Sequence, residues 1–217
     1  MITPMKTNQP GRPKYIPIAE CEICSQLEEV ETSFYKYSWD DMTLLLPPAA
    51  ARLEPAEDIS SGEKKENHIK RCPVCGIFYE YSMSYEYFVN GSEDEEKLTR
   101  LTPTQARRFL TDEEYDRLIG IIQSSLDDPN ILTRRYAAKC LVSHHLELGE
   151  MDAVRQYLSH PDREVALGAL RFLLMLAERR EKVKELTGLK DVIEGLEGCP
   201  DQEVSQKAGA LLLWLKP

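Results

Sequence analysis

Two short motifs decide how the first half of this chain folds: Cys21-Glu22-Ile23-Cys24 and Cys72-Pro73-Val74-Cys75. A C-x-x-C turn brings two thiolates to one side of a tight loop, where both can bind the same metal ion. Two such turns can complete a tetrahedron around one ion, and this closed shell is typical of a structural site rather than a catalytic one. One pair alone would also suit redox chemistry, but neither pair lies in the βαβ pattern typical of that function.

Cysteine usage also indicates the compartment. Residues 1–15 contain no apolar block typical of a secretory signal, so we expect the six cysteines to stay reduced in the cytoplasm. No apolar run approaches the roughly 20 residues that a membrane-spanning helix needs. Cys140 and Cys199 lie outside the paired motifs, and we expect them to pack as small apolar side chains.

Aromatic runs of strand type flank the motifs, at 34–37 and at 77–89, where the second run ends at the turn dipeptide Asn90-Gly91. Gly76 follows the second motif and supplies the permissive backbone that such a turn needs. This pattern resembles the zinc-ribbon family, in which two knuckles and a small antiparallel sheet hold one zinc ion. The resemblance covers about 20–100 and implies a structural Zn²⁺ with four ligands: Cys21, Cys24, Cys72 and Cys75.

The chain departs from that family in the 47 residues between Cys24 and Cys72, and we interpret 25–71 as an inserted loop. Two alternatives stay open, namely that His68 replaces one of the cysteines and that no metal binds. A sheet this small, with Trp39 and a few tyrosines as its core, cannot offset chain entropy alone. Metal binding would therefore be linked to folding of this region.

After Leu101 the apolar period changes to three or four residues, which is typical of helices. The stretch Thr111-Asp112-Glu113-Glu114 matches a capping box. Three prolines, separated by 32 and 39 residues, then precede helical segments: Pro129, Pro161 and Pro200. Counted from each proline, offset eight gives an alanine and offset twelve a leucine. Such spacings are within the range of stacked helix pairs, with 151–158 and 189–196 as the other helix of two pairs.

This half resembles the HEAT and armadillo families, over about 110–217. The resemblance implies an all-α solenoid of about three helix pairs that presents a concave face to a protein partner. The predicted fold class is thus α+β, with a small antiparallel sheet before the helical repeats. We predict three parts: a flexible basic tail at 1–19, a zinc-ribbon-like domain at 20–100 and the repeat domain at 101–217.

Basic residues recur on the predicted repeat helices. They are most simply solvated surface residues, but they could instead form a stripe that binds an acidic partner: Arg134, Arg135, Lys139, Arg163 and Arg171. His144 and His145 are adjacent and suggest a binding site, but we expect one imidazole to pack in the protein and the other to be solvated.

The net charge of −10 is concentrated in one region, since 20–100 holds 18 acidic and 8 basic residues. An acidic surface repels phosphate backbones, so a nucleic-acid partner is disfavoured. No phosphate loop, zinc-protease motif or nucleophile elbow is present, so we predict neither an enzyme nor a small-molecule substrate.

The sequence therefore favours a zinc-binding protein-interaction module. The alternative is a bacterial immunity or inhibitor protein whose acidic half covers a basic toxin enzyme such as a nuclease. Nucleic-acid binding by the ribbon aromatics is a third, weaker hypothesis.

Overall fold

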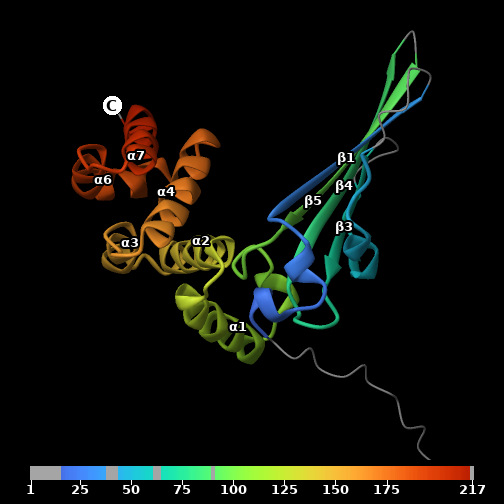
Figure 1. Cartoon of the computed structure of the whole chain (residues 1–217), viewed down its shortest axis with the longest axis horizontal. Coiled ribbons are helices and arrows are strands. Elements are labelled where there is room, and N and C mark those ends of the chain that lie inside the picture. Colours follow the sequence, from blue (N-terminus) through green and yellow to red (C-terminus); the bar gives the residue numbers. More distant parts are fainter. Residues whose placement is uncertain (1–15, 38–43, 61–64, 89–90, 216–217) are drawn as a thin grey trace, which may run out of the picture. The chain divides into compact units, whose positions relative to one another are not determined.

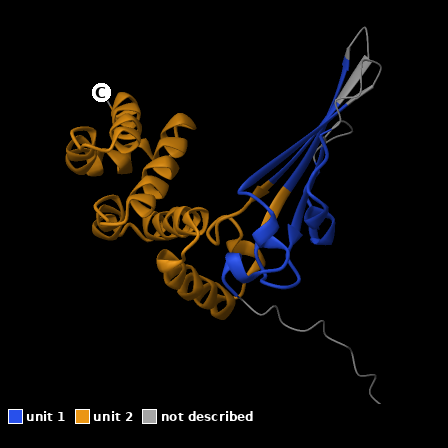
Figure 2. Ribbon diagram, viewed as in Figure 1, with its two compact units in different colours: residues 1–77, 81–98 blue, residues 78–80, 99–217 orange. Residues whose placement is uncertain are grey.

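A computed structural model describes residues 16–37, 44–60, 65–88 and 91–215 (Figure 1). Most of the predicted basic tail, the predicted core residue Trp39 and Asn90 of the predicted turn lie outside these ranges. The chain divides into two compact units (Figure 2). The first comprises 1–77 and 81–98, and the second comprises 78–80 and 99–217.

The first unit is built on a five-stranded antiparallel sheet whose strand order is β1-β5-β4-β3-β2. This sheet confirms the β part of the predicted α+β class. Its strands are β1 (Val30–Tyr37), β2 (Glu54–Asp58), β3 (Lys65–Arg71), β4 (Phe78–Phe88) and β5 (Gly91–Arg100). Three short 3₁₀ turns accompany them: η1 (Ile18–Glu20), η2 (Cys24–Gln26) and η3 (Pro48–Arg52).

Residues 25–71 are not the inserted loop that the sequence suggested, because they contain strands β1, β2 and β3. Strand β2 is fully exposed and pairs antiparallel with β3, with a register shift between Pro55 and Glu57. Charged side chains, a proline and a bulge are the features that keep an edge strand from pairing with other chains. A strand of this kind carries no apolar alternation, so periodicity could not reveal it.

The second unit contains the helices, as predicted for the C-terminal half. The α-helices are α1 (Asp112–Ser124), α2 (Ile131–Leu148), α3 (Met151–Leu158), α4 (Arg163–Glu178), α5 (Val183–Leu186), α6 (Lys190–Glu197) and α7 (Gln202–Trp214). Short 3₁₀ turns connect them: η4 (Arg107–Phe109), η5 (Ser125–Asp127) and η6 (Thr187–Leu189).

The residue after each predicted proline caps a helix. The side chains of Asn130, Asp162 and Asp201 accept hydrogen bonds from backbone N–H groups in the first turns of α2, α4 and α7. Thr111 and Glu114 form the predicted capping box of α1. Each cap satisfies a backbone donor that would otherwise have no partner, which fixes where the helix begins.

Small residues allow these helices to approach closely. Helix α4 packs against α2 and α7, and the alanines at the repeated offset, Ala137, Ala169 and Ala208, are fully buried. Gly168 in α4 lies directly against α2. A Cβ atom built at this glycine would lie 2.5 Å from the carbonyl oxygen of Arg135 and 2.8 Å from its Cα atom.

Gly168→Ala is therefore expected to push α2 and α4 apart and to lower the free energy of unfolding by about 1–3 kcal/mol. The measurement is urea denaturation followed by circular dichroism at 222 nm. Gly120→Ala in α1 is the matched control, because no atom lies within 4 Å of its added Cβ. This control should gain up to about 1 kcal/mol from helix propensity. Equal effects of the two alanines would contradict the close approach.

Candidate metal centre

The four predicted ligand cysteines come from two turns of the first unit. Cys21 and Cys24 lie where η1 passes into η2. In this turn the N–H of Cys24 donates to the Cys21 sulfur at 3.3 Å, and the N–H of Ser25 donates to the Cys21 carbonyl at 3.0 Å. The turn thus folds the backbone around its first sulfur atom.

The second turn connects β3 to β4. The N–H of Cys72 donates to the carbonyl of Ile77 at 2.8 Å, and the N–H of Gly76 donates to the carbonyl of Cys72 at 2.9 Å. Gly76 has a φ angle of +79°, which side chains disfavour and glycine accepts. The expectation that this glycine supplies a permissive backbone is confirmed.

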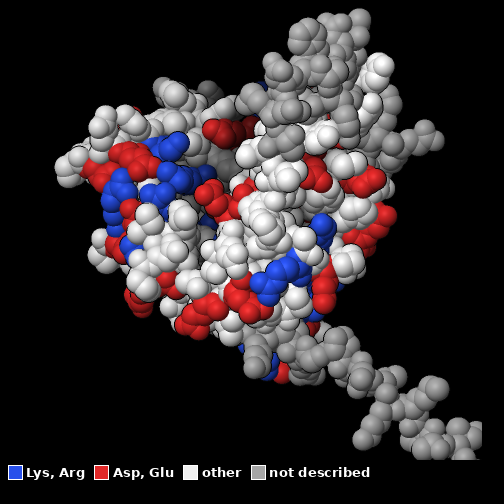
Figure 3. Space-filling model, turned by 45° about the vertical axis from the view of Figure 1, so that its right-hand side comes forward, with Lys and Arg blue, Asp and Glu red and all other residues white. Residues whose placement is uncertain are grey.

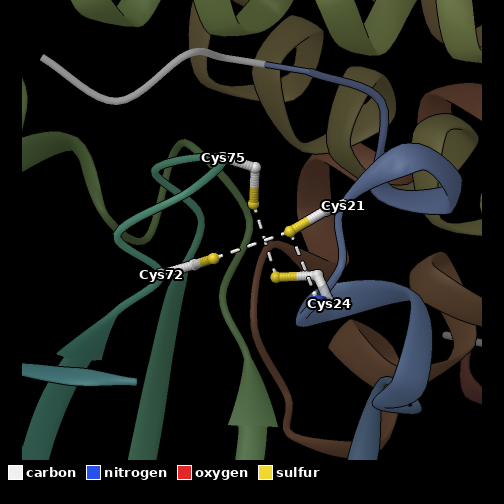
Figure 4. Close-up of side chains that lie close together, drawn as sticks. All are labelled: Cys21, Cys24, Cys72 and Cys75. Carbon is white, nitrogen blue, oxygen red and sulfur yellow. Dashed lines mark hydrogen bonds between the residues drawn. The ribbon is translucent and has the colours of Figure 1, made fainter. Parts of the chain in front are cut away.

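The two turns bring their sulfur atoms together (Figure 4). The Sγ atoms of Cys21 and Cys72 lie 3.6 Å apart, and those of Cys24 and Cys75 lie 3.4 Å apart. All four sulfurs lie within 4.8 Å of one another. Four sulfurs bound tetrahedrally at about 2.3 Å from one ion would be separated by about 3.8 Å. The cluster has the size of a four-thiolate metal shell and can hold a metal ion.

The cluster is shielded from water. Exposure of each cysteine is at most 1%, and Ile23 and Ile77 beside them are also buried. The sulfurs titrate unequally. Hydrogen bonds from Cys24, and then from Cys72 and Cys75, hold the pKa of Cys21 far below its ordinary value. Contact with Cys21, Cys24 and Cys72 raises the pKa of Cys75.

The opposite pKa shifts of Cys21 and Cys75 have a chemical consequence. Neighbouring thiols donate to one thiolate and stabilise its charge, but removing the last proton would leave four negative charges together in a dry site. A bound cation removes that obstacle, because metal ligation requires and stabilises the thiolate form. The donor set therefore fits a soft divalent ion.

The other candidate ligands lie elsewhere. His68 is in β3, where its Nδ1 lies 3.5 Å from Asp58 and its ring stacks on Tyr81, and it is not part of the sulfur cluster. Cys140 is buried in α2, as predicted, whereas Cys199 is half-buried. Neither belongs to the cluster.

The predicted partner-binding cations mostly form ion pairs within the helical unit. Arg134 Nε lies 3.1 Å from Asp162, and Arg135 pairs with Glu164. The Arg163 guanidinium contacts Asp201 at 2.5 Å and Glu203 at 2.7 Å. Arg171 pairs with Glu203 at 2.5 Å. Lys139, the fifth predicted cation, is buried in α2. Partner binding by these five residues stays a prediction.

These pairs connect helices that pack against each other, namely α2 with α4, and α4 with the N-terminal end of α7. Glu164 in α4 bonds to both Arg135 and Arg163. Burial alone would raise its pKa, but the hydrogen bonds from the two arginines outweigh burial and lower it. The cationic charge is thus largely neutralised by neighbouring carboxylates. Figure 3 likewise shows basic and acidic side chains close together on the face in view.

The adjacent histidines form a polar cluster between helices α1, α2 and α3. Nδ1 of His144 lies 2.8 Å from the hydroxyl of Tyr115, and Nδ1 of His145 lies 2.7 Å from a carboxylate oxygen of Glu150. The hydroxyl of Tyr157 lies 3.4 Å from Nε2 of His145. Both histidines are half-buried, so the expectation that one packs and the other is solvated is wrong.

No family model, curated protein or solved structure matches this chain. Among the residues that the structure describes, no helix has the length and apolar character required to cross a membrane.

The histidine cluster predicts a pH dependence of stability. Burial, and then the neighbouring His145, lowers the pKa of His144 below its ordinary value of 6.5. As pH falls through the unfolded-state pKa, the unfolded chain takes up a proton before the folded chain does, so stability decreases. Urea denaturation between pH 7.5 and about 5 should show this decrease.

His144→Gln keeps a hydrogen-bonding group for Tyr115 and should give a shallower decrease over the same pH range. Leu132→Ala removes an exposed leucine of α2 and no titratable group, so it is the control and should keep the slope of the natural chain. An unchanged slope in His144→Gln would contradict the assignment.

Proposed function

We propose that the chain is a non-enzymatic, zinc-binding protein-interaction module. In this proposal a structural Zn²⁺ stabilises the acidic N-terminal unit, and the helical unit binds a protein partner. One observation carries the metal assignment: four buried sulfur atoms from two turns lie within 4.8 Å of one another.

Zinc is the ion that this donor set favours. Thiolate ligands select soft or borderline ions, and a four-sulfur tetrahedron is typical of structural zinc. Four protein ligands leave no coordination position for water or substrate, so the site would serve folding rather than catalysis. Thiols must stay reduced to bind the ion, which favours a cytoplasmic location.

The ion would connect parts of the first unit that are distant in sequence. Cys21 and Cys72 are 51 positions apart. The apolar core of the sheet unit is small over the residues that the structure describes, where the buried aliphatic residues are Ile18, Ile23, Leu27, Ala49, Ala50, Leu53, Ile69, Ile77 and Leu98. Because so small a core contributes little stability, metal binding would supply much of the free energy of folding.

The helical unit supports the binding half of the proposal. Helices α2, α4 and α7 contact one another in sequence, and each is capped by the same type of turn. We infer that they are successive repeats of a HEAT/armadillo-like stack. Such stacks expose an extended helical surface that suits a protein partner rather than a small substrate.

A second candidate function follows from the edge of the sheet. Strand β2 is exposed along its whole length and presents Glu54, Glu57 and Asp58 to solvent. A surface of this charge suits a basic partner, and complementary charge would speed its capture. An inhibitor that covers a basic enzyme such as a nuclease would use this edge.

Removal of the metal tests the folding role. Elemental analysis of the purified chain should find one zinc ion per chain. Chelation, or the substitution Cys72→Ser, should abolish near-ultraviolet circular dichroism from the tyrosines of the sheet and leave most helical signal at 222 nm. Cys199→Ser, which alters a cysteine outside the cluster, should keep both metal and signal. A chain stripped of metal with an unchanged sheet spectrum would contradict the proposal.

Partner capture tests the binding role. The metal-loaded full chain, immobilised and exposed to native cell extract, should retain a protein identified by mass spectrometry. The Gly168→Ala variant serves as the comparison, because it disturbs the packing of α2 on α4. Recovery of nucleic acid alone would overturn the proposed function.

A further inference from the structure

Helix α7 leaves a large aromatic side chain uncovered. Val204, Ala208 and Leu211 on one face of the helix are buried, as is Leu215 just after its end, and this buried face anchors the helix. Trp214 is nevertheless 42% exposed, and the preceding Leu213 is 65% exposed. Tryptophan is the residue type most enriched at the energetic centres of protein interfaces, so its exposure on a well-anchored helix points to a binding role.

Trp214 forms one wall of an open hollow of about 580 Å³. The remaining lining comes from the segment that follows α4, namely residues 180 and 182–185. The C-terminal ends of α4 and α7, which pack against each other, lie at the same end of the helical unit (Figure 1). The hollow is therefore formed by the C-terminal end of one helix, α7, and by one short segment after α4.

That segment has an unusual backbone. Arg180 and Lys182 have φ angles of 59° and 50°, in the left-handed region that favours glycine. Neighbouring hydrogen bonds hold this conformation, including those from the N–H of Arg180 to Ala177 at 2.9 Å and from the N–H of Glu181 to Leu176 at 2.8 Å. These two bonds are the Schellman pattern of a helix C-terminus, which ends α4 and fixes the backbone from which the Arg180 side chain projects.

The charges around the hollow are mainly positive. Lys182 Nζ is 2.7 Å from Glu147 and is neutralised by it. Arg180 and Lys184 are exposed, and no ion pair joins either of them to a carboxylate within the described ranges. Glu185 is the acidic residue of the lining. The hollow therefore combines an aromatic wall with two cations available to a ligand.

We propose that this hollow, formed by Trp214, Arg180 and Lys184, binds an acidic segment of a partner protein that also carries an apolar side chain. The apolar side chain packs on the indole ring, and carboxylates pair with the two cations. This inference rests on the proposed function, and it names the partner chemistry of the helical unit. It also assigns the contact to cations other than those already paired with Glu164 and Glu203.

The charge of the chain favours a peptide over a nucleic acid at this surface. A polynucleotide places many phosphates along the molecule, and residues 101–217, with 19 acidic and 16 basic residues, lack the excess of cations needed to bind them. A short peptide brings only the two or three carboxylates that the local cations can pair with. Its apolar side chain meets the indole with no further electrostatic cost.

The test uses the metal-loaded full chain and fluorescence anisotropy of three labelled peptides of about 12 residues. The first carries three Asp or Glu residues and three Leu residues in a Gly/Ser background, the second replaces the acids by Lys, and the third replaces Leu by Ser. The first peptide should bind most tightly, and added salt should weaken its binding. Trp214→Ala and the double variant Arg180→Gln/Lys184→Gln should each weaken that binding by about tenfold.

Two substitutions are matched controls. Leu148→Ala removes an exposed leucine at the end of α2, and Lys190→Gln removes an exposed cation in α6; both should bind as the natural chain does. Arg180→Gly separates a binding role of the Arg180 side chain from a role in stability, because the two measurements should change in opposite directions. It should raise the melting temperature by relieving the left-handed backbone, yet weaken binding of the acidic peptide.

Several results would overturn the inference. Equal binding of the lysine peptide, or unchanged binding in Trp214→Ala, excludes an acidic ligand at this hollow. An oligothymidylate that binds the natural chain and not Trp214→Ala assigns the surface to nucleic acid. Self-association lost in Trp214→Ala assigns it to a second copy of the chain. Bound zinc and a captured protein partner, with a peptide response insensitive to these variants, would remove only this inference and leave the proposed function standing.

Discussion

Convergence of four sulfur atoms is the constraint on which the N-terminal unit depends. Cys21 and Cys24 lie before the first strand, whereas Cys72 and Cys75 lie between β3 and β4, and all four sulfurs meet in a space of metal-shell size. Strands β1 to β3 must therefore form within a closed loop. Closing a loop of this length costs chain entropy, and the small sheet core buries too little apolar surface to offset that cost. A shared ion would offset that cost at the place where the loop closes.

The same residues show what spacing can and cannot predict. The cysteine pairs and Gly76 could be read from the sequence because the chemistry of a knuckle is local. Strand β3, Lys65–Arg71, could not, because one isoleucine among charged residues gives no alternation. It becomes a strand because β2 and β4 pair with it on either side. Pairing with neighbouring strands thus determines the structure of a segment whose own sequence shows no preference for a strand.

The ion pairs of the helical unit also could not be predicted from the sequence. The clustering of the cations in sequence suggested a basic surface, but Arg135 pairs with Glu164 and Arg163 with Asp201, 29 and 38 positions further along. Glu164 lies in α4 and Asp201 caps α7, so only the packing of one helix on another brings these carboxylates to the arginines. The Arg135–Glu164 pair is largely buried, with side-chain exposures of 19% and 12%, so removing one partner would leave the other charge poorly solvated. The pairs of Arg163 are more exposed, and each contributes little stability. These pairs join α2 to α4 and α4 to α7, and so favour one arrangement of the three helices.

Helix α7 buries one face and leaves large apolar side chains exposed beside it. Val204, Ala208 and Leu211 are buried, whereas Leu213 is 65% and Trp214 is 42% exposed. Removing apolar surface from water is favourable, so an apolar group that covered the exposed part of the indole would gain free energy. Arg180 and Lys184 line the same hollow as Trp214, so a ligand that covered the indole would also meet positive charge. This combination of an aromatic wall and nearby cations supports the proposed contact with an acidic segment that carries an apolar side chain.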